Sequence, residues 1–227
     1  MAWDAFAPVQ LAPDVWSLPL RRVNAYALKA AEGTVLVDAG NPGDGPRVLT
    51  MLQVAGLEPP ALILLTHADV DHAGGVRDLL RACAPRVLAA GPEALVLAGR
   101  GRPRLLRRLG RLGSGRVRCS ATVRDGECVA GLTVVSTPGH TRGHCSYLRE
   151  SDGLLFTGDA LAVRDGMVRI PGQPFTEDWP RAYASLARLV SLHPRLLLPG
   201  HGAPLAEPDA ALQLALKTER APRRRLS

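Results

Sequence analysis

Short apolar runs separated by turn-forming residues fill the first forty positions, a pattern typical of β-strands. The segments VQLAPDVWSL, RRVNAYALKA and GTVLVDAG carry these runs, and Pro, Asn and Gly interrupt them. Residues 47–55 differ, because apolar side chains recur there at helical spacing from Val48 to Ala55. We therefore expect strands over the first forty residues, a turn and a helix, and then a short apolar strand at 61–66 (ALILLT).

The rest of the chain repeats this order of strands followed by helices. The pattern predicts helices at 76–83, 92–112, 179–192 and 208–216, and strands at 86–90, 116–123, 128–137, 145–151, 153–158 and 195–198. Two halves, each strand-rich first and helical later, fit a layered α/β arrangement of antiparallel strands with helices outside. The pattern alone does not choose among such folds.

Length and composition narrow the class of protein. The chain has 227 residues, which suits a single domain over 1–219, and we expect a disordered basic tail at 220–227. We see no transmembrane run, and MAWDAFAPVQ lacks the features of a signal peptide. These features predict a cytoplasmic protein without a membrane partner. The four cysteines are expected to be free and buried, with a Cys119–Cys128 bridge as the alternative.

Positive charge is concentrated in two places. The net charge is +7, and much of it lies in residues 100–118 (RGRPRLLRRLGRLGSGRVR) and in the tail RRR at 223–225. A basic segment can bind nucleic acid. No aromatic residues stand between these arginines to stack on bases, so a solvated face is the preferred interpretation and nucleic acid is not an expected partner.

Potential metal ligands follow four apolar, strand-like runs. ALILLT precedes His67, GLTVVSTPG precedes His140, GLLFTG precedes Asp159, and RLLLPG precedes His201. Strand ends are rigid supports for functional loops. Imidazole nitrogens and carboxylate oxygens are good ligands for zinc, iron and manganese. Four such strand ends in one chain predict a metal site.

The densest cluster is the segment HADVDH at 67–72. Its ligands are too close together to reach one ion, and alternate residues of an extended segment point to opposite sides. His67 and Asp69 are thus expected to serve one metal, and Asp71 and His72 a second. The glycines that follow, Gly74 among them, let the backbone turn away tightly.

The motifs THADVDH, TPGHTRGH, FTGDA and PGHG resemble, in this order, those of the metallo-β-lactamase superfamily. They look most like its glyoxalase II-like hydrolases, which favour a TPGHTxGH stretch. The resemblance covers roughly residues 10 to 205 and includes LVDAG around Asp38. It implies an αββα sandwich with a dinuclear metal site at one edge.

The resemblance also assigns the ligands. It gives one metal to His67, Asp69 and His140 and the other to Asp71, His72 and His201, with Asp159 bridging both. Asp38 is similar to a buried aspartate that supports the metal loop by hydrogen bonds. His144 is expected to support the site without binding metal, and His193 is expected on the surface.

One position departs from the family pattern HxHxDH, because Asp69 replaces its second histidine. A carboxylate makes the site more anionic and harder, which suits iron or manganese as well as zinc. Two divalent ions are the expected cofactors, and zinc is the expected metal. Whether Asp69 binds metal is left open by the sequence.

The resemblance implies a hydrolase that uses a metal-bridging hydroxide, with Asp71 orienting the nucleophile and moving a proton. Expected substrates are a small ester, thioester or lactone. Few residues follow His201, which argues against glutathione thioesters, and no tyrosine closely follows Asp159, which argues against lactones. Two alternatives stay open: a mononuclear iron oxygenase resembling persulfide dioxygenases, with His67, His140 and Asp159 as ligands, and a nucleic-acid phosphodiesterase. The natural substrate and the oligomeric state cannot be read from the sequence.

Overall fold

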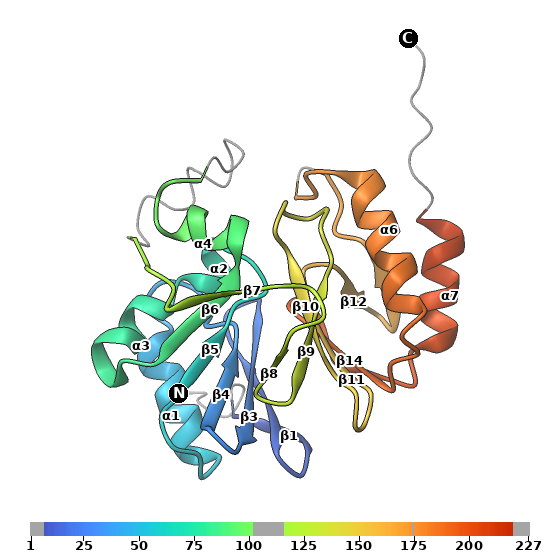
Figure 1. The fold of residues 1–227 in the computed structure, drawn as a ribbon. Coiled ribbons are helices and arrows are strands. Elements are labelled where there is room, and N and C mark those ends of the chain that lie inside the picture. Colours follow the sequence, from blue (N-terminus) through green and yellow to red (C-terminus); the bar gives the residue numbers. More distant parts are fainter. Residues whose placement is uncertain (1–6, 102–115, 174, 220–227) are drawn as a thin grey trace.

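Two β-sheets pack face to face, and helices cover the outer face of each sheet (Figure 1). The computed structural model describes residues 7–101, 116–173 and 175–219. This four-layered arrangement confirms the αββα sandwich expected from the sequence.

The first sheet is built from the N-terminal half of the chain. In the described part it has seven strands in sequence order: β1 (Val9–Ala12), β2 (Val15–Pro19), β3 (Asn24–Ala30), β4 (Gly33–Val37), β5 (Leu62–Leu64), β6 (Arg86–Ala90) and β7 (Ala121–Val123). The strands from β1 to β4 are antiparallel, whereas those from β4 to β7 are parallel.

The second sheet follows in the chain and has the order β15-β14-β11-β10-β9-β8. Its strands are β8 (Cys128–Val129), β9 (Leu132–Ser136), β10 (Cys145–Arg149), β11 (Leu154–Gly158), β14 (Leu196–Pro199) and β15 (Leu205–Ala206). β11 and β14 are parallel, and the other neighbours are antiparallel. The antiparallel strands expected from the sequence are therefore found from β1 to β4 and in most of the second sheet, but not from β4 to β7 or between β11 and β14. Helical connections between β4 and β6, and between β11 and β14, allow the parallel pairs.

Helices flank both sheets. They are α1 (Gly45–Val54), α2 (Val70–Ala73), α3 (Val76–Cys83), α4 (Gly91–Leu97), α6 (Trp179–Val190) and α7 (Asp209–Thr218). In Figure 1, α1 and α3 lie outside the first sheet, and α6 and α7 lie outside the second. α3 and β6 have the bounds that the sequence predicts.

Three apolar clusters hold the four layers together. Because successive side chains of a strand point to opposite faces, Leu36 and Ile63 pack with α1 and α3, whereas Val35 and Leu64 face the second sheet. The cluster between the sheets includes the buried ring of Phe156. A third cluster fills the space between the second sheet and the helices α6 and α7. Both sheets are thus buried on their two faces near the centre.

Several local predictions fail. The helix expected at 92–112 ends at Leu97, and the part of that prediction at 102–112 lies outside the described residues. The strand expected at 116–123 is reduced to β7. After β11 the chain forms a hairpin of β12 (Ala162–Arg164) and β13 (Met167–Arg169), where the sequence pattern predicted no strands. Its two-residue turn, Asp165 and Gly166, has positive φ at both positions, as a type I′ turn requires.

The cysteines differ in part from expectation, and the basic segments lie mostly outside the described residues. All four cysteines are free, so no Cys119–Cys128 bridge forms, and only Cys145 is buried while Cys128 is exposed. Most of the basic segment at 100–118, and the tail at 220–227, lie outside the described residues. Among the helices that the structure describes, none is long and apolar enough to cross a membrane.

Replacing Phe156 by alanine should lower the free energy of unfolding by about 3–5 kcal/mol, because it opens a cavity between the two sheets. Urea unfolding of the metal-free protein, followed by circular dichroism, measures this change. Leu214→Ala on α7 is the control, because this side chain is 50% exposed and should change stability by less than about 0.5 kcal/mol. Equal effects of the two substitutions would contradict the described packing.

Candidate metal centre

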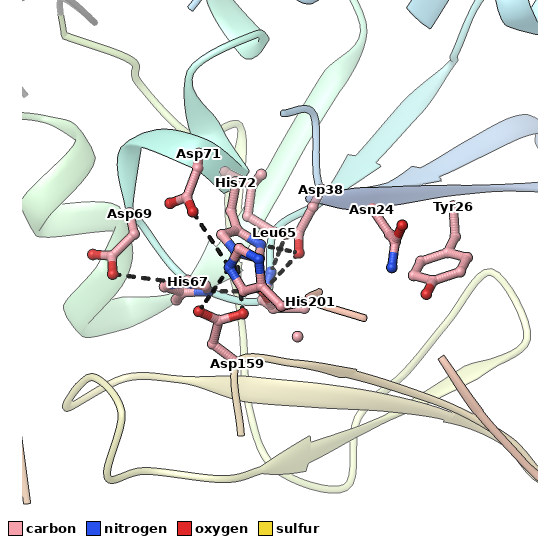
Figure 2. Close-up of polar contacts among 12 residues, drawn as sticks. Asn24, Tyr26, Asp38, Leu65, His67, Asp69, Asp71, His72, Asp159 and His201 are labelled. Atoms are coloured by element: carbon pink, nitrogen blue, oxygen red, sulfur yellow. Dashed lines mark hydrogen bonds and ion pairs between the residues drawn. The ribbon is translucent and has the colours of Figure 1, made fainter. Parts of the chain in front are cut away.

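The ends of strands from both sheets meet at one edge of the sandwich and carry the candidate ligands (Figure 2). Asp38 follows β4, and His67 lies shortly after β5. His140 lies in the loop between β9 and β10, Asp159 directly follows β11, and His201 follows β14. Because β4 and β5 are parallel, and β11 and β14 are parallel, the carboxyl ends of each pair reach the same edge.

The segment after His67 is not the extended chain that the sequence predicts. Asp69 has extended backbone and precedes the short helix α2, so Asp71 and His72 lie in a helical turn. Gly74 and Gly75, which follow α2, have an ordinary helical φ. They are needed because other parts of the chain lie too close to leave room for a side chain. A Cβ atom at Gly75 would lie 2.1 Å from the carbonyl oxygen of Ala39. The backbone of this loop is therefore packed directly against the end of β4.

The structure brings all seven predicted ligands into one cluster, from which three overlapping groups could hold a metal ion. The groups are His67, Asp69 and His140; His67, His72 and Asp159; and Asp71, His72 and His201. Within each group, one ligand atom from each residue lies within 4.8 Å of the others. The first and third groups are the two sets that the resemblance assigns to separate metals.

Distances between the ligand atoms fit a shared metal ion. Nε2 of His72 lies 3.2 Å from Oδ1 of Asp159, and Nε2 of His140 lies 3.3 Å from Oδ2 of both Asp69 and Asp159. Charge-assisted N–H···O bonds are usually shorter, about 2.7–2.9 Å. Tetrahedral coordination with bonds of about 2.0–2.2 Å places two ligand atoms about 3.4 Å apart. The cluster therefore has the spacing of a coordination shell.

Burial gives independent support for a cation. The Nε2 atoms of His67 and His72 are buried and make no hydrogen bond in the described structure, and the same holds for Oδ1 of Asp159. These atoms have charged neighbours at 3.2–3.5 Å but no hydrogen bond, and a buried polar atom without a hydrogen bond is costly. A metal ion bound between these atoms would remove that cost, so the residues present fit such an ion.

Asp38 orients two of the histidines, as expected from the sequence (Figure 2). Its Oδ1 accepts from the backbone N–H of Thr66, and its Oδ2 accepts from the Thr66 hydroxyl. Oδ2 also lies 2.8 Å from Nδ1 of His72. The same Thr66 hydroxyl lies 2.9 Å from Nδ1 of His67. In both rings Nδ1 is thus engaged, which leaves Nε2 to face the cluster.

His144 supports the site without joining any of the three groups, in line with its prediction. Its ring is fully buried, and its Nε2 accepts from the backbone N–H of Asp159. Nδ1 must then carry the proton, and it lies 2.8 Å from Oγ1 of Thr137. Burial, together with the nearby His67 and His140, holds the pKa of His144 well below its usual range. The ring is neutral and fixes the backbone at Asp159.

His201 is held by residues that the sequence did not reveal. Its Nδ1 lies 2.6 Å from the carbonyl oxygen of Arg22, whose own φ of 66° is unusual for a residue other than glycine. Asn24 donates its side-chain amide to the carbonyls of Pro199 and Gly202, on either side of His201. These partners lie about 175 residues away in the chain, so no local pattern could have indicated them.

The remaining histidine is remote from the centre. The side chain of His193 is 72% exposed and lies 3.9 Å from Asp209. Its place on the surface confirms the prediction.

Charges within the cluster favour cations. Burial opposes protonation of His72, but Asp159 and Asp38 outweigh it and raise its pKa well above the usual range. For His201, burial also lowers the pKa, yet hydrogen bonds with Asp159 and Asp71 raise it to about 10. Burial would raise the pKa of Asp159, whereas His72 and His140 hold it well below its usual value. A metal ion would therefore displace protons from these histidines when it binds.

The cluster opens to solvent on one side. The side chains of Asp71 and His201 are 35% and 33% exposed, whereas those of His67 and His72 are fully buried. Among the described residues of the cluster, Asp71 and His201 are the most exposed, and Asp69 is 19% exposed, so a substrate can approach the centre from this side.

Comparison with known proteins agrees with this fold. A family model of the metallo-beta-lactamase superfamily matches residues 18–201. The chain therefore belongs to the metallo-β-lactamase superfamily, and this membership indicates a metal-dependent hydrolase.

The match to this chain spans different shares of the individual relatives. The uncharacterized protein YobT of Bacillus subtilis (strain 168) is 29% identical over 223 residues, covering 89% of this chain and 94% of YobT. A hydroxyacylglutathione hydrolase of Xanthomonas axonopodis pv. citri is 36% identical over 192 residues, or 83% of this chain. The match spans only 64% of that hydrolase. A crystal structure of TTHA1623 in a di-iron-bound form has a TM-score of 0.68 at 30% identity, covering 90% of this chain and 96% of that one.

Replacing Asp38 by asparagine should weaken Zn²⁺ binding about 10–100-fold. The amide N–H₂ of asparagine cannot accept the hydrogen bonds that Asp38 now accepts from Thr66 and His72, so His67 and His72 would lose their orientation. Competition with a chromophoric chelator measures the affinity. Asp125→Asn is the matched control: Asp125 also accepts a backbone N–H, from Ser136, but lies outside the cluster. Equal affinity in the two variants would show that the hydrogen bonds of Asp38 do not orient metal ligands.

Proposed function

We propose that this chain is a dinuclear metal-dependent hydrolase of a small ester, thioester or lactone. The observation that carries the proposal is that two ligand groups with no residue in common both contact one carboxylate, that of Asp159. Oδ1 of Asp159 lies 3.2 Å from His72, and its Oδ2 lies 3.3 Å from His140 and 3.4 Å from His201. One carboxylate thus contacts histidines of both groups, as a bridging ligand would.

In this proposal, His67, Asp69 and His140 hold one ion, and Asp71, His72 and His201 hold the other. The assignment of Asp69 is supported by the distances from its Oδ2 to two histidines, 3.5 Å to Nε2 of His67 and 3.3 Å to Nε2 of His140. These spacings match those of the other ligand pairs. The aspartate in place of the family's histidine is therefore proposed as a ligand rather than a defect of the site.

Two bound divalent ions would lower the pKa of a water molecule to near neutrality and polarise the bond to be cleaved. The chain supplies the remaining functions. Asp71 is the carboxylate on the open side, and its pKa is lowered: burial would raise it, but the hydrogen bond with His201 and the charge of His72 prevail. An ionised Asp71 can orient the attacking water and carry a proton to the leaving group.

The comparisons support a glyoxalase II-like branch and a thioester among the substrates to test. Hydroxyacylglutathione hydrolases share about a third of their residues with this chain in the matched region. Zinc is the proposed metal, because it suits imidazole and carboxylate ligands. Iron is the alternative metal, supported by the di-iron-bound form of the similar protein TTHA1623.

Elemental mass spectrometry of the purified protein tests the two-metal proposal directly. We expect two metals per chain, falling towards one in Asp69→Ala because only the first group loses a ligand. His193→Ala is the control, since this exposed histidine lies outside the cluster and should leave the metal content at two. At least one of these substrate classes, a small ester, thioester or lactone, should then be hydrolysed by the metal-loaded protein, and chelation of the metal should abolish the activity.

A different result would favour the mononuclear alternative. One iron per chain, unchanged in Asp69→Ala, would contradict the dinuclear hydrolase. It would favour an iron oxygenase that uses His67, His140 and Asp159, three ligands that suit iron(II). Oxygen consumption with a persulfide would then be the activity to measure.

A further inference from the structure

Glu93 is a buried carboxylate beside the metal centre that belongs to none of the ligand groups. It lies in the first turn of α4, and only 3% of it is exposed. A glutamate is rarely this buried unless it is paired. Its two oxygens serve two different loops: Oε2 accepts from the backbone N–H of Ala68 at 2.8 Å, and Oε1 accepts from the backbone N–H of Gly143 at 2.9 Å.

The two loops that Glu93 joins carry the first ligand group. Ala68 stands between His67 and Asp69, and Gly143 lies three residues after His140. The first loop follows β5 of one sheet, and the second joins β9 and β10 of the other. One carboxylate therefore sets the distance between ligands that come from different sheets.

The packing around Gly143 is built for this contact. A Cβ atom there would lie 2.8 Å from Cβ of Pro92 and 2.9 Å from Oε1 of Glu93. Distances this short would force the loop or the glutamate to move. The glycine thus permits the close approach that the hydrogen bond requires.

The other ligand group has different supports. His72 is oriented by Asp38, and His201 is oriented by the carbonyl oxygen of Arg22. Neither contact involves Glu93.

We propose that Glu93 is a positioning residue that selectively sets the metal affinity of the group formed by His67, Asp69 and His140. It acts through the backbone of two loops and does not contact the metal. The inference rests on the proposed function, because it assumes that this group binds a metal ion.

The test measures Zn²⁺ affinity in two backgrounds, each of which keeps one ligand group intact. His201→Ala leaves the first group, and Asp69→Ala leaves the second. Glu93→Gln is introduced into both, because glutamine keeps the size of the side chain but turns an amide N–H₂ towards one of the two backbone N–H donors. Competition with a chromophoric chelator gives each dissociation constant.

Glu93→Gln should weaken Zn²⁺ binding about 10–100-fold in the His201→Ala background and less than about threefold in the Asp69→Ala background, whose ligands Glu93 does not support. Thermal unfolding of the metal-free proteins shows whether each variant folds. If the Glu93 variants do not fold, Gly143→Ala replaces them, because it displaces the same contact without burying a new polar group. Its expected result is the same selective loss.

Two results would overturn the inference. Equal weakening in both backgrounds would show that Glu93 has a general structural role. No weakening in the His201→Ala background would show that the two hydrogen bonds of Glu93 are not needed to position the first ligand group. Both leave the proposed function intact. If neither background binds Zn²⁺ while Glu93 is present, the proposed dinuclear centre fails together with this inference.

Discussion

The carboxylate of Asp38 fixes the end of β5 and the ring of His72 from its own position at the end of β4. Its backbone has φ of 59°, a left-handed conformation that aspartate tolerates better than most residues but that still costs about 1–3 kcal/mol. Hydrogen bonds to a charged acceptor contribute about 1.5–3 kcal/mol each. The three that Asp38 accepts can therefore offset the strain and hold the residue where the site needs it.

Other parts of the metal centre are also held by hydrogen bonds from residues that are not candidate metal ligands. His144 holds the backbone of Asp159, Arg22 holds the ring of His201, and Glu93 ties two loops together. These contacts are effective because the three apolar clusters keep the strands themselves fixed. Two sheets packed face to face bring their strand ends to one edge, where the loops that follow the strands can meet.

The sequence was sufficient to bring the residues of the cluster together because His67, His140, Asp159 and His201 each follow a recognisable apolar run. His140 and His201, 61 residues apart in the numbering, were linked only by that shared context. The supports could not be found in this way. Glu93 and Gly143 are 50 residues apart, and the partner of Asn24 lies 175 residues away. Contacts between a side chain and a distant backbone leave no local pattern in a single sequence.

Other differences have local causes. Alternation within 67–72 predicted an extended segment, but the four residues of α2 are too few for a helical period to show. The hairpin of β12 and β13 could have been predicted, since Asp165-Gly166 between short apolar stretches is a strong signal for a type I′ turn. The direction of the strands could not be predicted, because the connections between distant strands decide whether neighbouring strands are parallel or antiparallel.

The most direct test of this account is a crystal structure of the metal-loaded protein with anomalous diffraction measured at the absorption edge of the bound metal. We expect two anomalous peaks about 3.5–4 Å apart, one among His67, Asp69 and His140 and one among Asp71, His72 and His201, with Asp159 between them. A single peak, with the carboxylate of Asp69 turned away from it, would contradict the dinuclear centre.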